Sequence, residues 1–538
     1  YRDKAENIHT PGYEVEKDKV HLICGNKSCD FHDYDFELPL RLFDDDIYEN
    51  PPTLLFGTVD KFAMLPFIPK AKSLFGGDRE NAAPDLIIQD ELHLITGPLG
   101  SAVGIYEVLI DELCKSNGGL PKRIASTATI SHAKQQCNAL YGCGEENVFQ
   151  FPVQGTSYKD SFFAREKSDG IGRKYIGLYG AAMSTSASAS IATFAALIYA
   201  AKAIEVSEEK ARDPYWTNLA YFGSMRELGQ AATWYMTDIK ERLETIYKWR
   251  MEASLDRTKR RYIYGTGLAE LTSRMSNEEI PKILKKLEES YSGNVEMPED
   301  DKADKKKEFP LDICLATNMI SVGVDVSRLG LMTVTGQPKT MSEYIQTTSR
   351  VGRDAAHAPG VVYVIYNTSK SRDKSHYEKF QSQHEKLYYS VEPTSVTPFS
   401  EPMRERALPT IFAAIHRLIH APVDKRENAD YIPSNEELEK IVDSFVNRIG
   451  GIDCDEAENA KRQLEFCYRQ WIEWNPLRYS RKPGKLQGEA PLLIQTGTIR
   501  PDAWKDRGWD APTSMRNVDG TCGLDTTKTI WWQKERRQ

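Results

Sequence analysis

Two adjacent carboxylates, Asp90 and Glu91, follow the apolar run 86–88 in a pattern that can support chemistry on phosphate groups. At the end of a β-strand, Asp90 can hold Mg²⁺ through its water shell, and Glu91 can polarise a water that attacks a phosphate. The same two residues could instead occupy the first turn of a helix, where their charge would stabilise the helix dipole. The tetrapeptide that they form with Leu92 and His93 leaves both interpretations open.

Two further groups of polar residues could complete such a site. Thr127 and Thr129 follow a predicted strand. Gln346 precedes Arg350 and Arg353, whose spacing predicts that both arginines lie on one face of a helix. An arginine there could stabilise the charge that develops on a γ-phosphate. Taken alone, an arginine pair at this spacing is more typical of a solvated helix face.

Short apolar segments alternate with helical patterns along most of the chain, and these elements must position the polar residues. The predicted strands are residues 53–57, 85–89, 123–126, 219–222, 313–316, 331–334 and 361–365. This alternation is typical of parallel sheets flanked by helices. From residue 371 onward helical spacing dominates. The sequence therefore predicts an α/β architecture with a mostly helical C-terminal extension.

Length and composition narrow the class of protein. The 538 residues suffice for about three or four domains. Aspartate plus glutamate exceed lysine plus arginine by 78 to 70, so nucleic acid would have to bind a local basic surface. Nine unevenly spaced cysteines and the absence of an N-terminal leader predict a cytoplasmic location. Serines and Lys202 interrupt the apolar stretch 180–204, so we expect a buried helix there and no membrane span.

The polar groups within residues 85–354 resemble, in their order, motifs II, III, V and VI of the superfamily two helicases. The resemblance implies two RecA-like parallel-sheet domains that bind ATP and Mg²⁺. Motif II would supply Asp90 and Glu91 for catalysis and for the metal, and His93 would couple the ATP state to the second domain. By the same resemblance, the coupling residues of motif III are Thr127 and Thr129. The catalytic residues of motif VI are Gln346, Arg350 and Arg353, and both arginines would also bind the nucleotide.

Other segments resemble the parts of these helicases that contact nucleotide and nucleic acid. Residues 316–325 resemble motif V, in which Gly323 and Asp325 would lie beside the nucleotide. Residues 58–62 resemble motif Ib, and the pair after the strand at 219–222 resembles motif IV. The residues that the resemblance assigns to the nucleic-acid backbone are Thr58, Asp60, Lys61, Gly223, Ser224, Thr317 and Asn318.

A segment near the C-terminus, residues 512–519, resembles a Ser-Met-Arg-x-Val-Asp signature of large bacterial helicases of anti-phage defence that work with a DUF1998-type partner. The resemblance implies an ATP-dependent DNA helicase or translocase. Two alternatives stay open: a non-hydrolysing nucleic-acid-binding scaffold, and an RNA helicase, because the motifs show no base or 2′-hydroxyl readout. The implied domains are an N-terminal hairpin segment, the C-terminal part of RecA-like domain 1, RecA-like domain 2 and the helical extension, at residues 1–50, 51–167, 168–370 and 371–538.

One element of the family pattern is missing from the sequence. A superfamily two motor needs a glycine loop that ends in Gly-Lys-Ser/Thr and cradles the phosphates. The only Gly-Lys pair here is Gly484-Lys485, which Leu486 follows and which lies far downstream of motif II. We therefore expect RecA-like domain 1 to be truncated at its N-terminal side, with the loop upstream or on another polypeptide. The remaining explanation, an inactive enzyme, is disfavoured by the intact hydrolysis residues.

Cys24 and Cys29 form a further candidate site. They lie on a predicted hairpin made of residues 20–24 and 29–31, and they resemble half of a zinc ribbon. A structural Zn²⁺ needs four ligands, and no second cysteine pair stands nearby in the sequence. Zinc binding and ordinary thiols therefore both remain possible interpretations.

Overall fold

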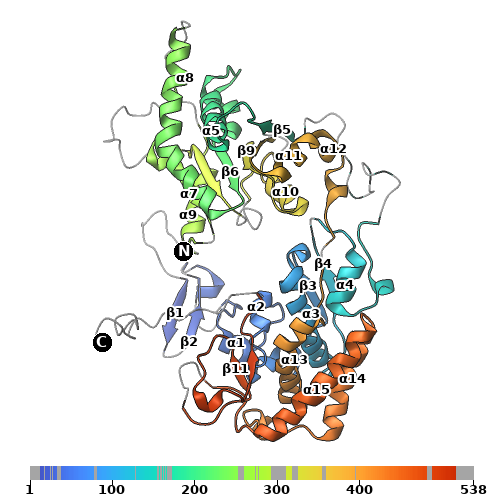
Figure 1. The fold of residues 1–538 in the computed structure, drawn as a ribbon. Helices are drawn as coiled ribbons and strands as arrows, with labels where there is room; N and C mark the ends of the chain where they lie inside the picture. Colours follow the sequence, from blue (N-terminus) through green and yellow to red (C-terminus); the bar gives the residue numbers. More distant parts are fainter. Residues whose placement is uncertain are drawn as a thin grey trace, which may run out of the picture. The chain divides into compact units, whose positions relative to one another are not determined.

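The computed structural model describes residues 12–16, 19–24, 26, 28–32, 38–77, 82–127, 129–153, 157, 160, 163, 165, 172–252, 260–272, 274–276, 278–291, 310–317, 325–353, 359–393, 395–481 and 487–516. The chain divides into two compact units (Figure 1). Unit 1 comprises Tyr1–Thr127, His132–Gln150 and Thr394–Gln538, and unit 2 comprises Ala128–Ser131 and Phe151–Pro393.

Unit 2 is built on a six-stranded sheet in which neighbouring strands are parallel and lie in the order β5-β10-β9-β6-β8-β7. The strands are β5 (Lys174–Tyr179), β6 (Asn218–Phe222), β7 (Leu268–Leu271), β8 (Ile313–Ala316), β9 (Leu331–Thr335) and β10 (Val361–Tyr366). The side chains of β6 and β8 are all buried, as is typical of a parallel sheet covered on both faces. The predicted strands at 219–222, 313–316, 331–334 and 361–365 are confirmed, and so is the parallel α/β fold class.

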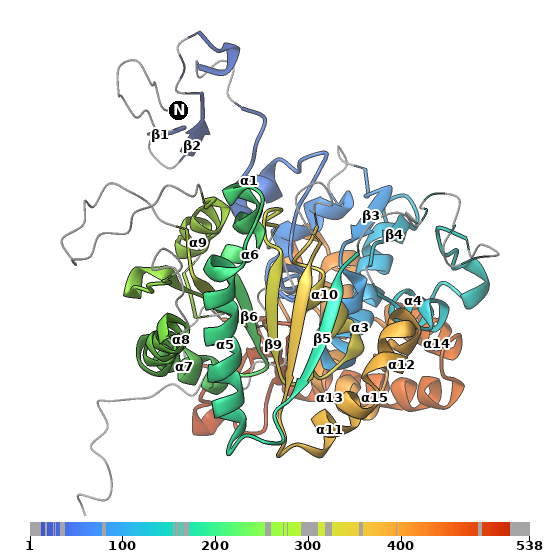
Figure 2. The ribbon, with the colours of Figure 1, turned by 90° about the horizontal axis from the view of Figure 1, so that it is seen from above.

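Helices cover both faces of this sheet. One face packs against α5 (Ser186–Ala203), α7 (Met225–Trp234) and α8 (Lys240–Glu252), and the other against α9 (Glu279–Glu288) and α10 (Met341–Thr348). Figure 2 shows α5 beside the strands β6 and β9 of this sheet. On the first face Phe194 of α5 meets Phe222 of β6, and on the second Leu287 of α9 packs in one cluster with Met332 of β9. This is the layered arrangement expected of a RecA-like domain.

Helix α5 is long and apolar enough to cross a membrane by length and composition alone. Its side chains Phe194, Ile198 and Tyr199 nevertheless pack into the cluster that covers β6 and β8. At its N-terminus the Thr185 hydroxyl accepts a hydrogen bond from the Ser188 amide, which satisfies one of the free donors of the first turn. In this structure α5 is therefore a core helix of unit 2.

In unit 1, β3 (Leu86–Gln89) and β4 (Lys122–Ala125) form a parallel pair connected through α3 (Gly97–Lys115), which is almost entirely buried. The strand predicted at residues 53–57 is not formed. Leu54 and Phe56 of this segment are 67% and 87% exposed, and the short helix α2 (Val59–Phe62) follows. A strand needs a neighbour to satisfy its backbone groups, and the described part of unit 1 pairs no strand with this segment.

The helices after residue 394 belong to the core of unit 1. They are α13 (Glu401–Ile415), α14 (Asn435–Gly450) and α15 (Cys454–Trp474), followed by the short parallel strands β11 (Leu493–Gln495) and β12 (Trp509–Ala511). Arg448 of α14 and Arg123 of β4 each lie 2.5 Å from an oxygen of Asp111 on α3, and all three side chains are buried or nearly so. These ion pairs hold α14 against α3 and β4. The prediction of a mostly helical region near the C-terminus is confirmed.

The N-terminal hairpin differs from its prediction. The strands β1 (Tyr13–Glu16) and β2 (Lys19–Leu22) pair antiparallel, whereas Asp30–His32 forms a 3₁₀-helix, η1, where a strand was predicted. The chain turns back here because the amide of Cys29 donates to the carbonyl of Asn26, and the amide of His32 donates to that of Cys29. Asn and Asp side chains favour such turns, and three of the residues at 26–30 are Asn, Ser and Asp.

The buried His416, at the start of the π-helical turn η12 (His416–His420), predicts a pH-dependent stability. Burial lowers the pKa of His416 to about 4 and also lowers the pKa of His420. A histidine with a folded pKa below its unfolded value of about 6.5 stabilises the fold above that pH, and the contribution disappears as the pH falls toward 4. We expect the shifted pKa of His416 alone to lower the free energy of unfolding by about 2 kcal/mol at pH 5 relative to pH 7.5.

Urea unfolding at both pH values, for the wild type and His416→Gln, would measure this effect. The variant should lose less stability on acidification than the wild type. An equal loss in both proteins would contradict the assignment to His416.

Candidate functional site

Asp90 lies at the carboxyl end of β3, where the chain leaves the sheet. The hydroxyl of Ser126, just beyond the neighbouring strand β4, donates a hydrogen bond to Asp90 Oδ1, and the amide of Glu91 donates to the same oxygen at 2.9 Å. These two donors fix the direction of the carboxylate at the edge of the sheet. A carboxylate held in this way can bind Mg²⁺ directly or through water.

Glu91 adopts a strained backbone conformation. Its φ and ψ angles of 51° and 49° lie in the left-handed region, which costs a non-glycine residue about 1–3 kcal/mol. The turn is held by the amide of Leu92, which donates to the carbonyl of Ser126 at 2.8 Å. The short 3₁₀-helix η4 (Leu92–Leu94) begins directly after Glu91, whereas α3 begins only at Gly97. Asp90 therefore lies at a strand end, as the first interpretation requires, and Glu91 is also the N-cap residue of a 3₁₀-helix.

His93 connects the predicted motifs II and III. Its Nδ1 lies 3.1 Å from Thr127 Oγ1 and 3.3 Å from Glu91 Oε2. The His93 side chain is 7% exposed, whereas that of Glu91 is 41% exposed, so solvent can reach the glutamate but hardly the imidazole. A change in the position or charge of the Glu91 carboxylate can therefore affect Thr127 through one side chain, that of His93. This geometry suits the coupling role that the resemblance implies for His93.

Thr129 stands two residues further along and falls in unit 2. Its Oγ1 lies 2.7 Å from Ser342 Oγ, and Gln346 Nε2 donates to the same serine at 3.2 Å. Both Thr129 and Gln346 are buried. The predicted motif III is thus divided, since Thr127 contacts the motif II group while Thr129 bonds to α10.

The prediction that Arg350 and Arg353 share a helix face is wrong. Helix α10 ends at Thr348, and both arginines lie in the loop that follows. Gly352 has a φ of 63°, and a Cβ atom there would come within 2.3 Å of the backbone nitrogen of Gly360. Gly352 can adopt this conformation beside Gly360 because it has no Cβ atom, and the spacing of the arginines does not reveal this loop.

The loop brings the predicted motifs V and VI together. Arg353 Nη1 lies 2.6 Å from Asp325 Oδ1, although 28 positions separate them in sequence. On the other side of the loop, Arg173 Nε and Nη2 donate to the carbonyl of Val351 at 3.1 and 3.0 Å. The sequence analysis did not single out Arg173, because a lone arginine before a strand carries no recognisable pattern. Arg173 holds the loop from which Arg350 and Arg353 project.

The residues predicted to contact nucleic acid follow strands or begin helices. In unit 1, Thr58 and Lys61 lie at the start of α2, are exposed, and Lys61 pairs with Asp44 at 2.7 Å. In unit 2, Gly223 and Ser224 lead from β6 into α7, and Thr317 follows β8. Asp60 contacts a distant segment, which is described below. Of the other predicted residues, Asn318 and Gly323 lie outside the described part of the chain.

The evidence for a metal site is limited to the carboxylate pair. Among the residues that the structure describes, no three or more His, Cys, Asp and Glu side chains gather to hold a metal ion. Cys24 and Cys29 are free, half-buried thiols, and the carbonyl of Cys24 lies 2.9 Å from Nδ1 of His32. Zinc at these cysteines stays a prediction.

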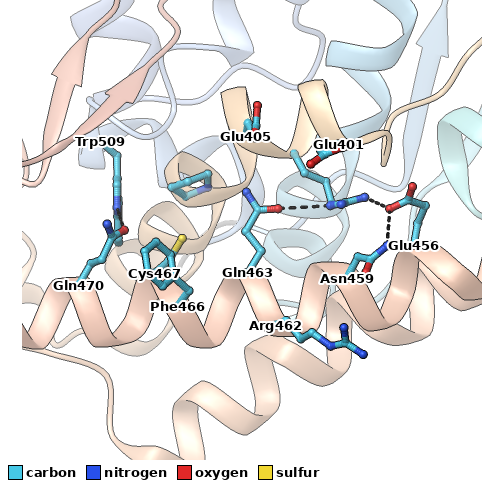
Figure 3. Close-up of a pocket in the computed structure, with 12 residues that line it drawn as sticks. Glu401, Glu405, Glu456, Asn459, Arg462, Gln463, Phe466, Cys467, Gln470 and Trp509 are labelled. Atoms are coloured by element: carbon cyan, nitrogen blue, oxygen red, sulfur yellow. Dashed lines mark hydrogen bonds and ion pairs between the residues drawn. The ribbon is translucent and has the colours of Figure 1, made fainter.

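A groove of about 520 Å³ between α13 and α15 contains none of the predicted residues (Figure 3). The buried Arg404 of α13 pairs with Glu456 of α15, and its Nε donates to Gln463 Oε1 at 3.3 Å. At the other end Trp509 Nε1 donates to Gln470 Oε1 at 3.0 Å. These contacts join α13 to α15 and α15 to β12.

Comparison with known proteins gives a consistent result. Residues 241–355 match the family described as the helicase conserved C-terminal domain. Over 559 aligned residues the chain is 36% identical to the DISARM protein DrmA of Bacillus paralicheniformis, and the match covers 95% of this chain and 47% of that protein. The resemblance to helicases, and to DrmA in particular, is confirmed.

Solved helicase structures are more distant. The DUF1998 helicase MrfA, solved with DNA, is 15% identical with a TM-score of 0.47, over 75% of this chain and 46% of that chain. The helicase Lhr of Mycobacterium smegmatis, solved with single-stranded DNA and AMP-PNP, is 13% identical with a TM-score of 0.41, over 82% of this chain and 44% of that chain. The chain spans about half the length of the relatives that it matches.

Proposed function

Because the chain is similar to the DISARM protein DrmA along nearly its whole length, we propose that it is an ATP-dependent DNA helicase or translocase of bacterial anti-phage defence. The observation that carries this proposal is the group of polar side chains at the ends of β3 and β4. There Ser126 orients Asp90, and His93 lies between Glu91 and Thr127. A strand-end group of this kind suits metal-assisted phosphoryl transfer.

In the proposed reaction, bound Mg-ATP supplies the γ-phosphate. Asp90 would hold the magnesium through its water shell, and Glu91 would orient and polarise the attacking water. Arg350 and Arg353 would stabilise the charge that develops on the phosphate. Asp325, the ion-pair partner of Arg353, would keep that guanidinium in place until nucleotide binds.

The phosphate-binding loop would come from polypeptide outside this sequence, preferably from a segment upstream. The surface of the β3–β4 pair supports this part of the proposal, because Leu86, Ile88 and Ile124 are 47%, 62% and 50% exposed. Parallel sheets are normally buried on both faces, and a pair of strands is not stable alone. Further strands that carry the glycine loop would complete the sheet and cover these side chains.

The proposed substrate is DNA that is single-stranded or carries a single-stranded overhang. Thr58, Lys61 and Thr317 would contact its sugar-phosphate backbone, which makes binding tolerant of sequence and sensitive to salt. We further propose a cytoplasmic location and a DUF1998-type protein partner resembling DrmB. A nucleic-acid-binding scaffold without hydrolysis is the second candidate function.

ATP hydrolysis by the native protein, measured with and without oligothymidine, tests the proposal. We expect single-stranded DNA to raise the rate several-fold, because nucleic acid and nucleotide would close the same two units. Oligouridine is the matched probe for an RNA helicase. A rate that does not respond to either probe would favour the scaffold.

A further inference from the structure

Asp60, in the first turn of α2, receives three contacts from a segment near the C-terminus of the chain. Ser514 Oγ donates to Asp60 Oδ1 at 2.8 Å, and the amide of Met515 donates to the same oxygen at 3.1 Å. Arg516 Nε lies 2.9 Å from the other oxygen, Oδ2. Both oxygens of the carboxylate are therefore engaged by residues more than 450 positions away.

The segment 514–516 is itself well anchored in unit 1. It follows β12, and the Met515 side chain is only 2% exposed. Arg406 of α13 donates from Nη2 to the carbonyl of Arg516 at 3.3 Å. The guanidinium of Arg516 is 66% exposed, yet its backbone is tied to the helical core. The segment can therefore serve as a fixed support for Asp60.

Helix α2 needs such a support. It has four residues, and a helix this short is not stable without tertiary contacts. Its N-cap residue, Thr58, makes no side-chain capping bond, and the preceding residues 53–57 are exposed. At the other end the chain is anchored by Ala63 and Leu65, which are 0% and 3% exposed. Asp60 therefore anchors the end that carries Thr58 and Lys61, together with the exposed ion pair between Lys61 and Asp44.

We infer that Ser514, Met515 and Arg516 form a latch on Asp60 that positions α2 so that Thr58 and Lys61 can contact the backbone of single-stranded DNA. The inference rests on the proposed function for the role of Thr58 and Lys61. In it, Asp60 and Arg516 are positioning residues, because the Asp60 carboxylate would repel a phosphate and is already fully bonded. In this inference, the role of the Ser-Met-Arg signature is to hold Asp60, and with it α2, in position.

Binding of fluorescent oligothymidine at several salt concentrations tests the latch. We expect Asp60→Ala and Arg516→Ala each to weaken binding by about 10-fold, with the double variant no weaker than either one. The slope of log affinity against log salt should fall by about 0.7 for each phosphate that the variant no longer neutralises. Arg516→Lys, which keeps a cation beside Asp60, should recover part of the affinity.

A direct contact between Arg516 and DNA predicts a different result. Removing the Asp60 carboxylate would then free the guanidinium, and Asp60→Ala would bind as tightly as the wild type or more tightly. That outcome would overturn the latch. The control is Arg462→Ala, because Arg462 is a similarly exposed arginine in unit 1, 3.3 Å from Glu458, and should change neither affinity nor slope.

Hydrogen exchange separates a failure of the latch from a failure of the proposed function. The amides of residues 61–64 should exchange faster in Asp60→Ala and Arg516→Ala than in the wild type, with no DNA present. Unchanged exchange at these amides would overturn the latch. A different outcome is that the wild type fails to bind oligothymidine while the two variants still exchange faster than the wild type at these amides. That outcome would overturn the proposed DNA contact and leave the latch supported.

Discussion

Replacing Glu91 with Gln is expected to lower the rate of DNA-stimulated ATP hydrolysis by about 10²- to 10⁴-fold, the range typical of a lost general base. The substitution keeps the size of the side chain but removes the charge that would polarise the attacking water. The left-handed backbone at this position and the Leu92–Ser126 hydrogen bond do not depend on the carboxylate, so the turn should persist. Phosphate release at saturating ATP and oligothymidine measures the effect.

Nucleotide and DNA binding should survive in Glu91→Gln, since Asp90 keeps its contacts with Ser126 and with the amide of residue 91. Glu112→Gln is a suitable control, because Glu112 pairs with Lys115 on α3, away from the strand ends. If Glu91→Gln retained full activity in cells under phage challenge, the scaffold function would be favoured over the motor.

Replacing Asp111 with Ala is expected to lower the free energy of unfolding by about 3–5 kcal/mol, as when one partner of a buried ion pair is removed. Asp111 is 3% exposed and pairs with Arg123 of β4 and Arg448 of α14. Without it, Arg448 loses this ion pair, and Arg123 keeps its ion pair with Glu107. Denaturant unfolding, followed by fluorescence and circular dichroism, measures the change.

The matched control for this prediction is Glu436→Ala, which removes an exposed carboxylate that pairs with Lys440 on α14. Exposed pairs contribute about 0–1 kcal/mol, so this variant should unfold almost as the wild type does. A loss below about 1 kcal/mol in Asp111→Ala would mean that the helices after residue 394 are held to α3 by apolar packing alone.

The strands predicted from the sequence are those whose apolar residues are contiguous. β6, β8 and β9 lie inside the sheet, and their side chains are nearly all buried, so periodicity identifies them. β5 and β7 were missed because they form the two edges of the sheet, where Lys174 and Glu270 interrupt the apolar pattern. Edge strands depend on the neighbour that pairs with them, and the local sequence contains no information about that neighbour.

Segment 53–57 shows the converse case. Its composition is that of a strand, yet in the described part of unit 1 no strand pairs with it, and it remains exposed. Similarly, the spacing of Arg350 and Arg353 fits a helix face, but α10 ends at Thr348, and the loop that follows brings Gly352 close to Gly360. In both cases a tertiary contact, present or absent, overrides the local preference.

The sequence by itself indicated which residues could carry chemistry and in what order, because strand ends follow apolar runs and place Asp90, Glu91 and Thr127 at one edge of a sheet. Only the tertiary structure decided that Ser126 orients Asp90 and that the Ser-Met-Arg segment engages Asp60. Such contacts join residues far apart in the chain, and their geometry depends on how the intervening helices pack. Local sequence patterns contain the periodicity of strands and helices. The hydrogen bonds of Ser126 with Asp90 and of Ser514 with Asp60 form only when the whole chain has folded.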